Sequence, residues 1–103
     1  MTPGEQQYQE IGNSLEEAVS SQMFGKPCFK VKGKAFMSFF EDCVVFKLPA
    51  DVREKALSLG GAVLFDPSGK GRPMKEWVQL PYDHTATWKD FAKAALDFVK
   101  ANA

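Results

Sequence analysis

The feature that most constrains the fold is a run of three apolar segments within residues 27–48, separated by very short turns. The segments are rich in Phe and Val, which favours strands over helices. Turns are expected at residues 32–34 and 41–42, and strands at 36–40 and 43–48 as well as before the first turn. Connections this short join only antiparallel neighbours. The run therefore predicts an antiparallel meander of three strands.

Helical spacing of apolar residues precedes the meander. This spacing predicts a first helix over residues 5–20. Ser14 and Glu17 fit a capping box, which marks Ser14 as an alternative start of its regular part. After the meander, a second helix is expected to follow Pro49 and to end at the glycine pair 60–61.

The second half of the chain predicts two more strands and a closing helix. The strands are expected at residues 62–65 and 76–80, and the helix opens at Thr87. Its buried stripe comprises Trp88, Phe91, Ala95, Phe98 and Val99. The order is then α-β-β-β-α-β-β-α in one domain, residues 1–103. Clustered strands with flanking helices indicate an α+β fold with a five-stranded antiparallel sheet.

Charge and hydropathy exclude several classes of protein. Thirteen Lys and Arg balance thirteen Asp and Glu, so the basic excess typical of nucleic-acid-binding proteins is missing. A local cluster of Lys26, Lys30, Lys32 and Lys34 keeps a regulatory, nucleic-acid-associated role as an alternative, with weak binding or none expected. No apolar run approaches the roughly 20 residues of a membrane span. The acidic, polar N-terminus does not resemble a signal peptide, and we expect a cytoplasmic protein.

Few residues in the sequence are candidates for a catalytic role. The single histidine, His84, lies beside Asp83 in a turn, which leaves open a small-molecule enzyme that uses His84 as a general base. A solvent-facing turn histidine is the simpler interpretation. Cys28 and Cys43 lie in separate strands and are interpreted as small hydrophobic residues with free thiols. Neither a metal-ligand pattern nor a cofactor motif is present, so no metal, no cofactor and no enzymatic activity are predicted.

The stretch "FDPSGKGRPMKEW", residues 65–77, is the longest predicted loop. Its glycines would let the backbone approach a ligand, as in a phosphate cradle, but a strand and not a helix follows, so the helix dipole of such sites is missing. A connection between strands is the simpler interpretation. Long loops are often functional, and the basic side chains of this one are candidate contacts to a ligand or partner: Lys70, Arg72 and Lys75.

In the meander, large apolar residues occupy both odd and even positions of the same strand. In residues 36–40 and 43–46, apolar side chains fall on both faces of the expected strands. One layer of helices can cover only one face of a sheet. The second set must be covered by another helix, by a self-associated sheet or by a partner, so a homodimer is among the possibilities.

Several short motifs, in order, resemble the TfoX N-terminal domain family (TfoX/Sxy-like), which is related to MmcQ/YjbR-like proteins. The match covers residues 20–100 and rests on these residues: Met23-Phe24-Gly25, Gly33-Lys34 with Phe36, Phe46-Lys47-Leu48, and Gly71-Arg72-Pro73-Met74 with Trp77. The resemblance implies a secretion-chaperone-like α+β fold and no known catalytic residues. It suggests a stand-alone binding or interaction module of a bacterial cytosol, and it adds Met23, Phe24 and Gly25 to the candidate binding residues.

Overall fold

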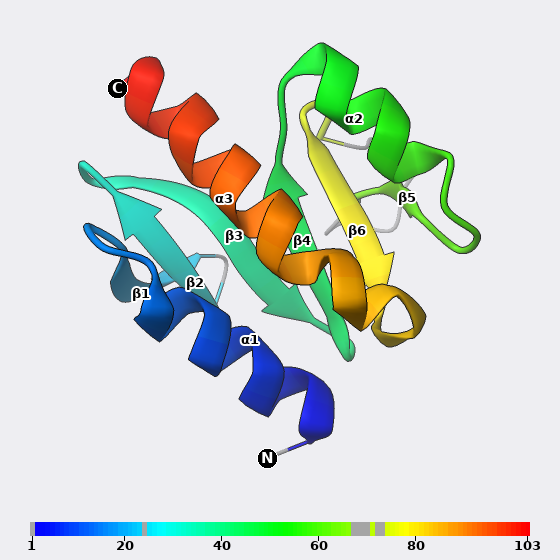
Figure 1. The fold of residues 1–103 in the computed structure, drawn as a ribbon, viewed down its shortest axis with the longest axis horizontal. Helices are drawn as coiled ribbons and strands as arrows, with labels where there is room; N and C mark the ends of the chain where they lie inside the picture. Colours follow the sequence, from blue (N-terminus) through cyan, green and yellow to red (C-terminus); the bar gives the residue numbers. More distant parts are fainter. Residues whose placement is uncertain (1, 24, 67–70, 72–73) are drawn as a thin grey trace.

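Six antiparallel strands carry the fold in the computed structural model, which describes residues 2–23, 25–66, 71 and 74–103. The elements in chain order are α1 (Pro3–Ser14), β1 (Val19–Met23), β2 (Lys26–Val31), β3 (Lys34–Phe40), β4 (Cys43–Lys47), α2 (Ala50–Leu57), β5 (Val63–Leu64), β6 (Trp77–Pro81), a 3-10 turn (Tyr82–His84) and α3 (Thr85–Ala101). In the sheet the strands lie in the order β1-β2-β3-β4-β6-β5 (Figure 1). The α+β class and the predicted meander, now β2 to β4, are confirmed.

The expectation of five strands is wrong, because β1 precedes the meander. Its residues, Val19–Met23, pair along their whole length with β2. Only its first and last residues are apolar, so the segment carries no clear strand pattern. The ladder to β2, and not local propensity, makes it a strand.

The limits of the first helix also differ from the prediction. Thr2 caps α1, since its Oγ1 accepts a hydrogen bond of 3.1 Å from the Glu5 N–H. The helix ends at Ser14, whose hydroxyl donates back to the Ile11 carbonyl at 2.7 Å. Ser14 therefore lies at the C-terminal end of this helix, and the expected capping box does not begin one.

Other boundaries are close to those predicted. The expected strand at residues 62–65 is only two residues long, Val63–Leu64. The strand expected at 76–80 runs from Trp77 to Pro81. The last helix begins at Thr85, two residues before the predicted start at Thr87. No helix in the described part of the chain is both long and apolar enough to cross a membrane.

The helices cover one face of the sheet. In Figure 1, α1 and α3 both cross this face, and α2 lies over the β6 side. The main core forms between the helices and the sheet, with Trp88 and Phe46 among its fully buried side chains. Strands β2, β4 and β6 supply the same layer with five apolar side chains: Phe29, Val31, Val44, Val78 and Leu80.

A β-bulge in β3 explains part of the occurrence of apolar residues at both odd and even positions. Lys30 pairs with Ala35, whereas the preceding Phe29 pairs with Met37, so β3 has one extra residue, Phe36, at this point. Both Phe36 and Met37 then belong to the main core and are fully buried. After the bulge the alternation resumes with Ser38.

Two further apolar residues of the meander, Phe40 and Val45, lie in a small cluster on the outer face of the sheet, which we call the outer cluster. Its buried members are Val45, Phe65 and Trp77. The Phe65 ring reaches across to Phe40, with ring centroids 5.3 Å apart in an edge-on arrangement. Val45 and Phe65 are completely buried within this single chain. The apolar residues on the outer face of the sheet therefore do not require a second copy or a partner to cover them.

Candidate functional site

Three of the six predicted contact residues lie outside the described part of the chain: Phe24, Lys70 and Arg72. The other three are Met23, at the end of β1, Gly25, in the turn to β2, and Lys75, in the turn before β6. Gly25 has a φ of 74°, a left-handed conformation that favours glycine. Lys75 is exposed.

The structure brings the two predicted segments to the same face. Met23 and Met74 are half-buried, and both pack against the outer cluster. Methionine is a flexible, polarisable side chain that is common at adaptable binding surfaces. Lys26 lies over the Phe40 ring at the border of this cluster, with its Nζ 4.8 Å from the ring centroid.

The glycine-rich loop uses one of its backbone donors internally. The Gly71 N–H donates to Asp66 Oδ2 at 2.9 Å. An anion would have to compete with this carboxylate for that donor. The rest of the predicted cradle, Gly69 and Lys70 with Arg72, lies outside the described residues.

His84 has a structural contact. Its Nε2 lies 2.6 Å from the Gly60 carbonyl, so Nε2 carries the proton and donates it. This bond ties the turn after α2 to the start of α3. If His84 were the general base of an enzyme, only its Nδ1 would be left to accept a proton. Among the residues that the structure describes, no three His, Cys, Asp or Glu side chains gather closely enough to hold a metal ion.

A different site forms where β3 and β4 separate. The two strands pair from Phe40 and Cys43 only as far as Met37 and Phe46. Beyond that point, Lys34 and Ala35 pair with β2 and no longer with β4, and Lys47 pairs with Trp77 on β6. Figure 1 shows the two strands diverging beneath the C-terminal half of α3. We call the opening between them the fork pocket.

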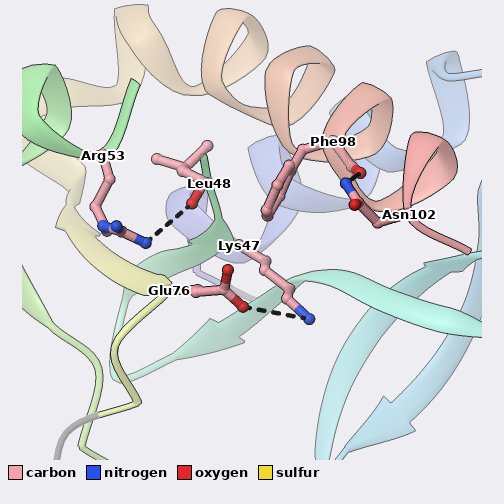
Figure 2. A network of polar contacts seen from close by, with 6 residues as sticks. All are labelled: Lys47, Leu48, Arg53, Glu76, Phe98 and Asn102. Atoms are coloured by element: carbon pink, nitrogen blue, oxygen red, sulfur yellow. Dashed lines mark hydrogen bonds and ion pairs between the residues drawn. The ribbon is translucent and has the colours of Figure 1, made fainter. Parts of the chain in front are cut away.

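The fork pocket has a volume of about 210 Å³. Six side chains from four segments line it: Lys34, Lys47, Glu76, Phe98, Val99 and Asn102. Figure 2 shows the Phe98 ring and the Lys47–Glu76 pair on facing sides of this opening. The pocket therefore combines an apolar wall from α3 with charged groups from the sheet.

Backbone hydrogen bonds hold one wall of the fork pocket in place. The Leu48 N–H donates to the Glu76 carbonyl at 2.9 Å, which continues the pairing of β4 with β6. Arg53 Nη1 donates to the Leu48 carbonyl at 3.4 Å (Figure 2). Glu76 thus has a fixed backbone, although its side chain is half exposed.

The charges in the fork pocket are only partly compensated. Lys47 Nζ lies 3.8 Å from Glu76 Oε1, a loose pair with both side chains partly exposed. Lys34 has no ion-pair partner among the described residues. Asn102 Nδ2 donates to the Phe98 carbonyl at 2.7 Å, so this amide caps the end of α3 and keeps its Oδ1 as an acceptor. The side chains give the pocket one excess positive charge.

Two other hollows are less suited to a ligand. The larger, of about 350 Å³, lies between the end of α1 and α3, but both of its lysines are already paired: Lys100 Nζ lies 2.7 Å from Glu17 Oε2, and Lys93 Nζ lies 3.1 Å from Asp97 Oδ1. The hollow between α2 and α3, of about 280 Å³, is mostly apolar and shallow. The hollow between α2 and α3 has a single lysine, Lys55, and one carboxylate, Asp90. Among these three hollows, only the fork pocket combines an apolar wall with two lysines of which one, Lys34, has no ion-pair partner among the described residues.

Sequence reasoning did not identify the fork pocket. Lys34 and Lys47 stood out only as members of a basic cluster and of a family-like motif, and Glu76 and Asn102 gave no signal. Lys26 and Lys30 lie on the outer face of the sheet. Lys34 pairs with Val31, so it lies on the same face as the buried Val31 and Phe29. Strand alternation thus divides the basic cluster between two faces.

Comparison of the chain with family models, with curated proteins and with solved structures gave no match. The resemblance to TfoX N-terminal domains remains a prediction from the motifs.

Proposed function

We propose that this chain is a non-enzymatic binding module, TfoX N-terminal-like and cytoplasmic, that binds a carboxylate-bearing ligand in the fork pocket. The observation that carries the proposal is the unpaired Lys34 ammonium, placed with Lys47 beside the Phe98 ring. An ammonium pair recognises an anion, and the apolar wall recognises the group attached to it.

The surrounding charges favour a carboxylate over a phosphate. Glu76 borders the pocket, and the last turn of α3, which ends near Asn102, contributes the negative end of its dipole. Both oppose a dianion more strongly than a monoanion. One excess positive charge is balanced by one carboxylate.

The lining residues support binding without catalysis. The six side chains around the fork pocket include neither a histidine nor a hydroxyl or thiol nucleophile. Lysine and glutamate can also act as acids, bases or nucleophiles when a neighbouring group activates them. Here Lys47 and Glu76 form a loose ion pair at 3.8 Å and Lys34 has no ion-pair partner among the described residues, an arrangement suited to holding an anion by charge. A cytoplasmic setting is supported by Cys28 and Cys43, which are free thiols on strands separated by β3.

An NMR titration tests the proposal. The probe is N-acetyl-L-phenylalanine, with its uncharged amide as the matched control ligand. We expect the acid, and not the amide, to shift the backbone amide signals of Lys34, Lys47 and residues 98–102. The variants Lys34→Ala and Lys47→Ala should each weaken binding about tenfold or more, since each removes a charge-assisted hydrogen bond. Lys93→Ala, which changes a lysine paired elsewhere on α3, should leave binding unchanged.

Further ligands separate the possible sources of the carboxylate. A tetrapeptide with a free C-terminus that binds better than its amidated form and better than the small acid would indicate a chain terminus as the natural ligand. Preference for the small acid would indicate a metabolite. Equal binding of the acid and the amide, or no response at the fork pocket, would refute the proposal.

A further inference from the structure

β1 forms an open edge of the sheet. It is the terminal strand in the order, and within the described part of the chain it pairs only with β2. Proteins protect such edges with charged side chains, proline or bulges. Val19–Met23 contains neither a charge nor a proline, and its register to β2 is unbroken. Val19 is 62% exposed. This edge is therefore unprotected.

The backbone groups that β1 presents outward can be assigned from Pro27. The Pro27 carbonyl accepts a hydrogen bond of 2.7 Å from Ser38 Oγ, so this carbonyl faces β3. Backbone groups alternate in direction along an antiparallel strand, so those of Cys28 face β1 and meet Ser21. The N–H and C=O groups of Ser20 and Gln22 then point away from β2, toward the open side.

We propose that β1 pairs antiparallel with β1 of a second copy of this chain, centred on Ser21. Ser20 would then lie opposite Gln22 of the second copy, and the two symmetric pairs would exchange backbone hydrogen bonds through their outward groups. Val19 would lie opposite Met23 of the second copy on the outer face, which buries the most exposed apolar side chain of the strand. The proposal goes beyond the ligand site and does not depend on it.

Charge favours a second copy as the occupant of this edge. The chain has no net charge, so two copies do not repel each other at long range. No charged residue of β1 would face its own equivalent, since β1 has none. In the antiparallel arrangement, the start of β1 in one copy would lie beside the end of β1 in the other. Glu16, which precedes β1, would then approach Lys26 of the second copy, which follows β1, so opposite charges meet. An extended peptide would gain the backbone bonds but not this symmetric match.

Sedimentation equilibrium tests the pairing. A five-residue strand pair is a small interface, so we expect weak association, with the mass rising above 11.4 kDa between about 10 μM and 1 mM protein. Ser20→Pro removes an outward N–H and spares the bonds to β2, so it should keep the monomer mass throughout. Its far-UV circular dichroism should match that of the unaltered chain.

A second variant keeps the test decisive if Ser20→Pro does not fold. Val19→Lys should abolish association, whereas Val63→Lys, on the opposite edge strand and 51% exposed, should leave it unchanged. The amide protons of Ser20 and Gln22 should also exchange more slowly as protein concentration rises. A constant monomer mass for the unaltered chain, or equal losses from Val19→Lys and Val63→Lys, would overturn the proposal.

Discussion

Gly12 of α1 lies directly against the ring of Phe29 on β2. A Cβ built at Gly12 would fall 2.1 Å from Phe29 Cε2 and 2.2 Å from Cζ. The Gly12-Asn13 pair looks in the sequence like a weak point in the helix. In the structure, Gly12 is the residue that allows α1 to approach the sheet.

Gly12→Ala should therefore destabilise the protein. Alanine favours a helix by up to about 1 kcal/mol over glycine, but overpacking a well-filled core costs about 1–3 kcal/mol, and the clash here is with a ring held in the core. We expect a net loss of unfolding free energy in urea melts. Gly60→Ala is the matched control, since nothing lies within 4 Å of its Cβ position. A gain for Gly12→Ala would mean that α1 shifts freely on the sheet.

Tyr8→Phe should preserve or raise stability. The Tyr8 side chain is fully buried against Phe29 and Phe39, and its hydroxyl has no hydrogen-bond partner among the described residues. Leaving a buried hydroxyl unsatisfied costs about 1–3 kcal/mol, so its removal should recover part of that. Thermal unfolding measures the change. A marked loss of stability would reveal a bound water or a partner for this hydroxyl.

An alkaline titration checks the same site independently. Burial raises the pKa of Tyr8 well above its ordinary range, and the nearby Cys28 and Glu5 add to this shift. The raised pKa disfavours the Tyr8 phenolate in the folded state. In the Tyr82→Phe variant, ultraviolet absorbance should therefore show no tyrosine ionisation before the protein unfolds. Ionisation of Tyr8 in the folded variant would contradict its burial.

The two cysteines should react as unequal free thiols. Burial raises the pKa of both thiols; Lys30 partly opposes the shift for Cys28, and a 3.6 Å hydrogen bond from Gln79 Nε2 partly opposes it for Cys43. Thiolate is the reactive form, so both should react slowly with a thiol reagent near pH 8. Cys43 is half-buried and Cys28 fully buried, so Cys43 should react first. Denaturation without reductant should release two thiols; finding none would contradict the strand order.

The ion pair between Glu17 and Lys100 should be visible in a pH titration. The hydrogen bond from Lys100 and then its charge lower the pKa of the Glu17 carboxyl, and the same contacts raise the pKa of Lys100. The pair therefore stabilises the fold between the two pKa values and is lost as pH falls through that of Glu17 or rises through that of Lys100. Lys100→Ala should return the Glu17 pKa, measured by NMR, toward its ordinary value. No change would mean that the pair does not persist in solution.

Binding to random duplex DNA should be weak. Lys26 and Lys30 lie on one face of the sheet and Lys34 has the parity of the other, so no single face presents the whole basic cluster. Even three or four neutralised phosphates would give a slope of log K against log salt of about −3 to −4, on a non-specific Kd of ~10⁻⁴ to 10⁻⁶ M. A mobility-shift assay with micromolar protein near physiological salt should show no complex. A tight, sequence-selective shift would favour the regulatory alternative over the binding module.

The sequence by itself determined the meander, the second and last helices and the α+β class, because each depends on local patterns. Segments rich in Phe and Val that are joined by two- or three-residue turns leave an antiparallel arrangement as the only solution for residues 27–48. The apolar stripe from Trp88 to Val99 likewise predicts a buried face of α3 without any knowledge of its partners.

Tertiary structure alone decided β1, the bulge at Phe36 and the fork pocket. β1 is a strand because β2 offers it a ladder, and its own residues give little strand signal. The bulge depends on how β2 and β3 match in register, which places Phe36 and Met37 in the same core. The fork pocket joins Lys34 and Lys47 to the distant Asn102 only because α3 crosses the point where β3 and β4 separate. Such contacts between remote segments leave no periodic pattern in a single sequence, so only the folded chain reveals them.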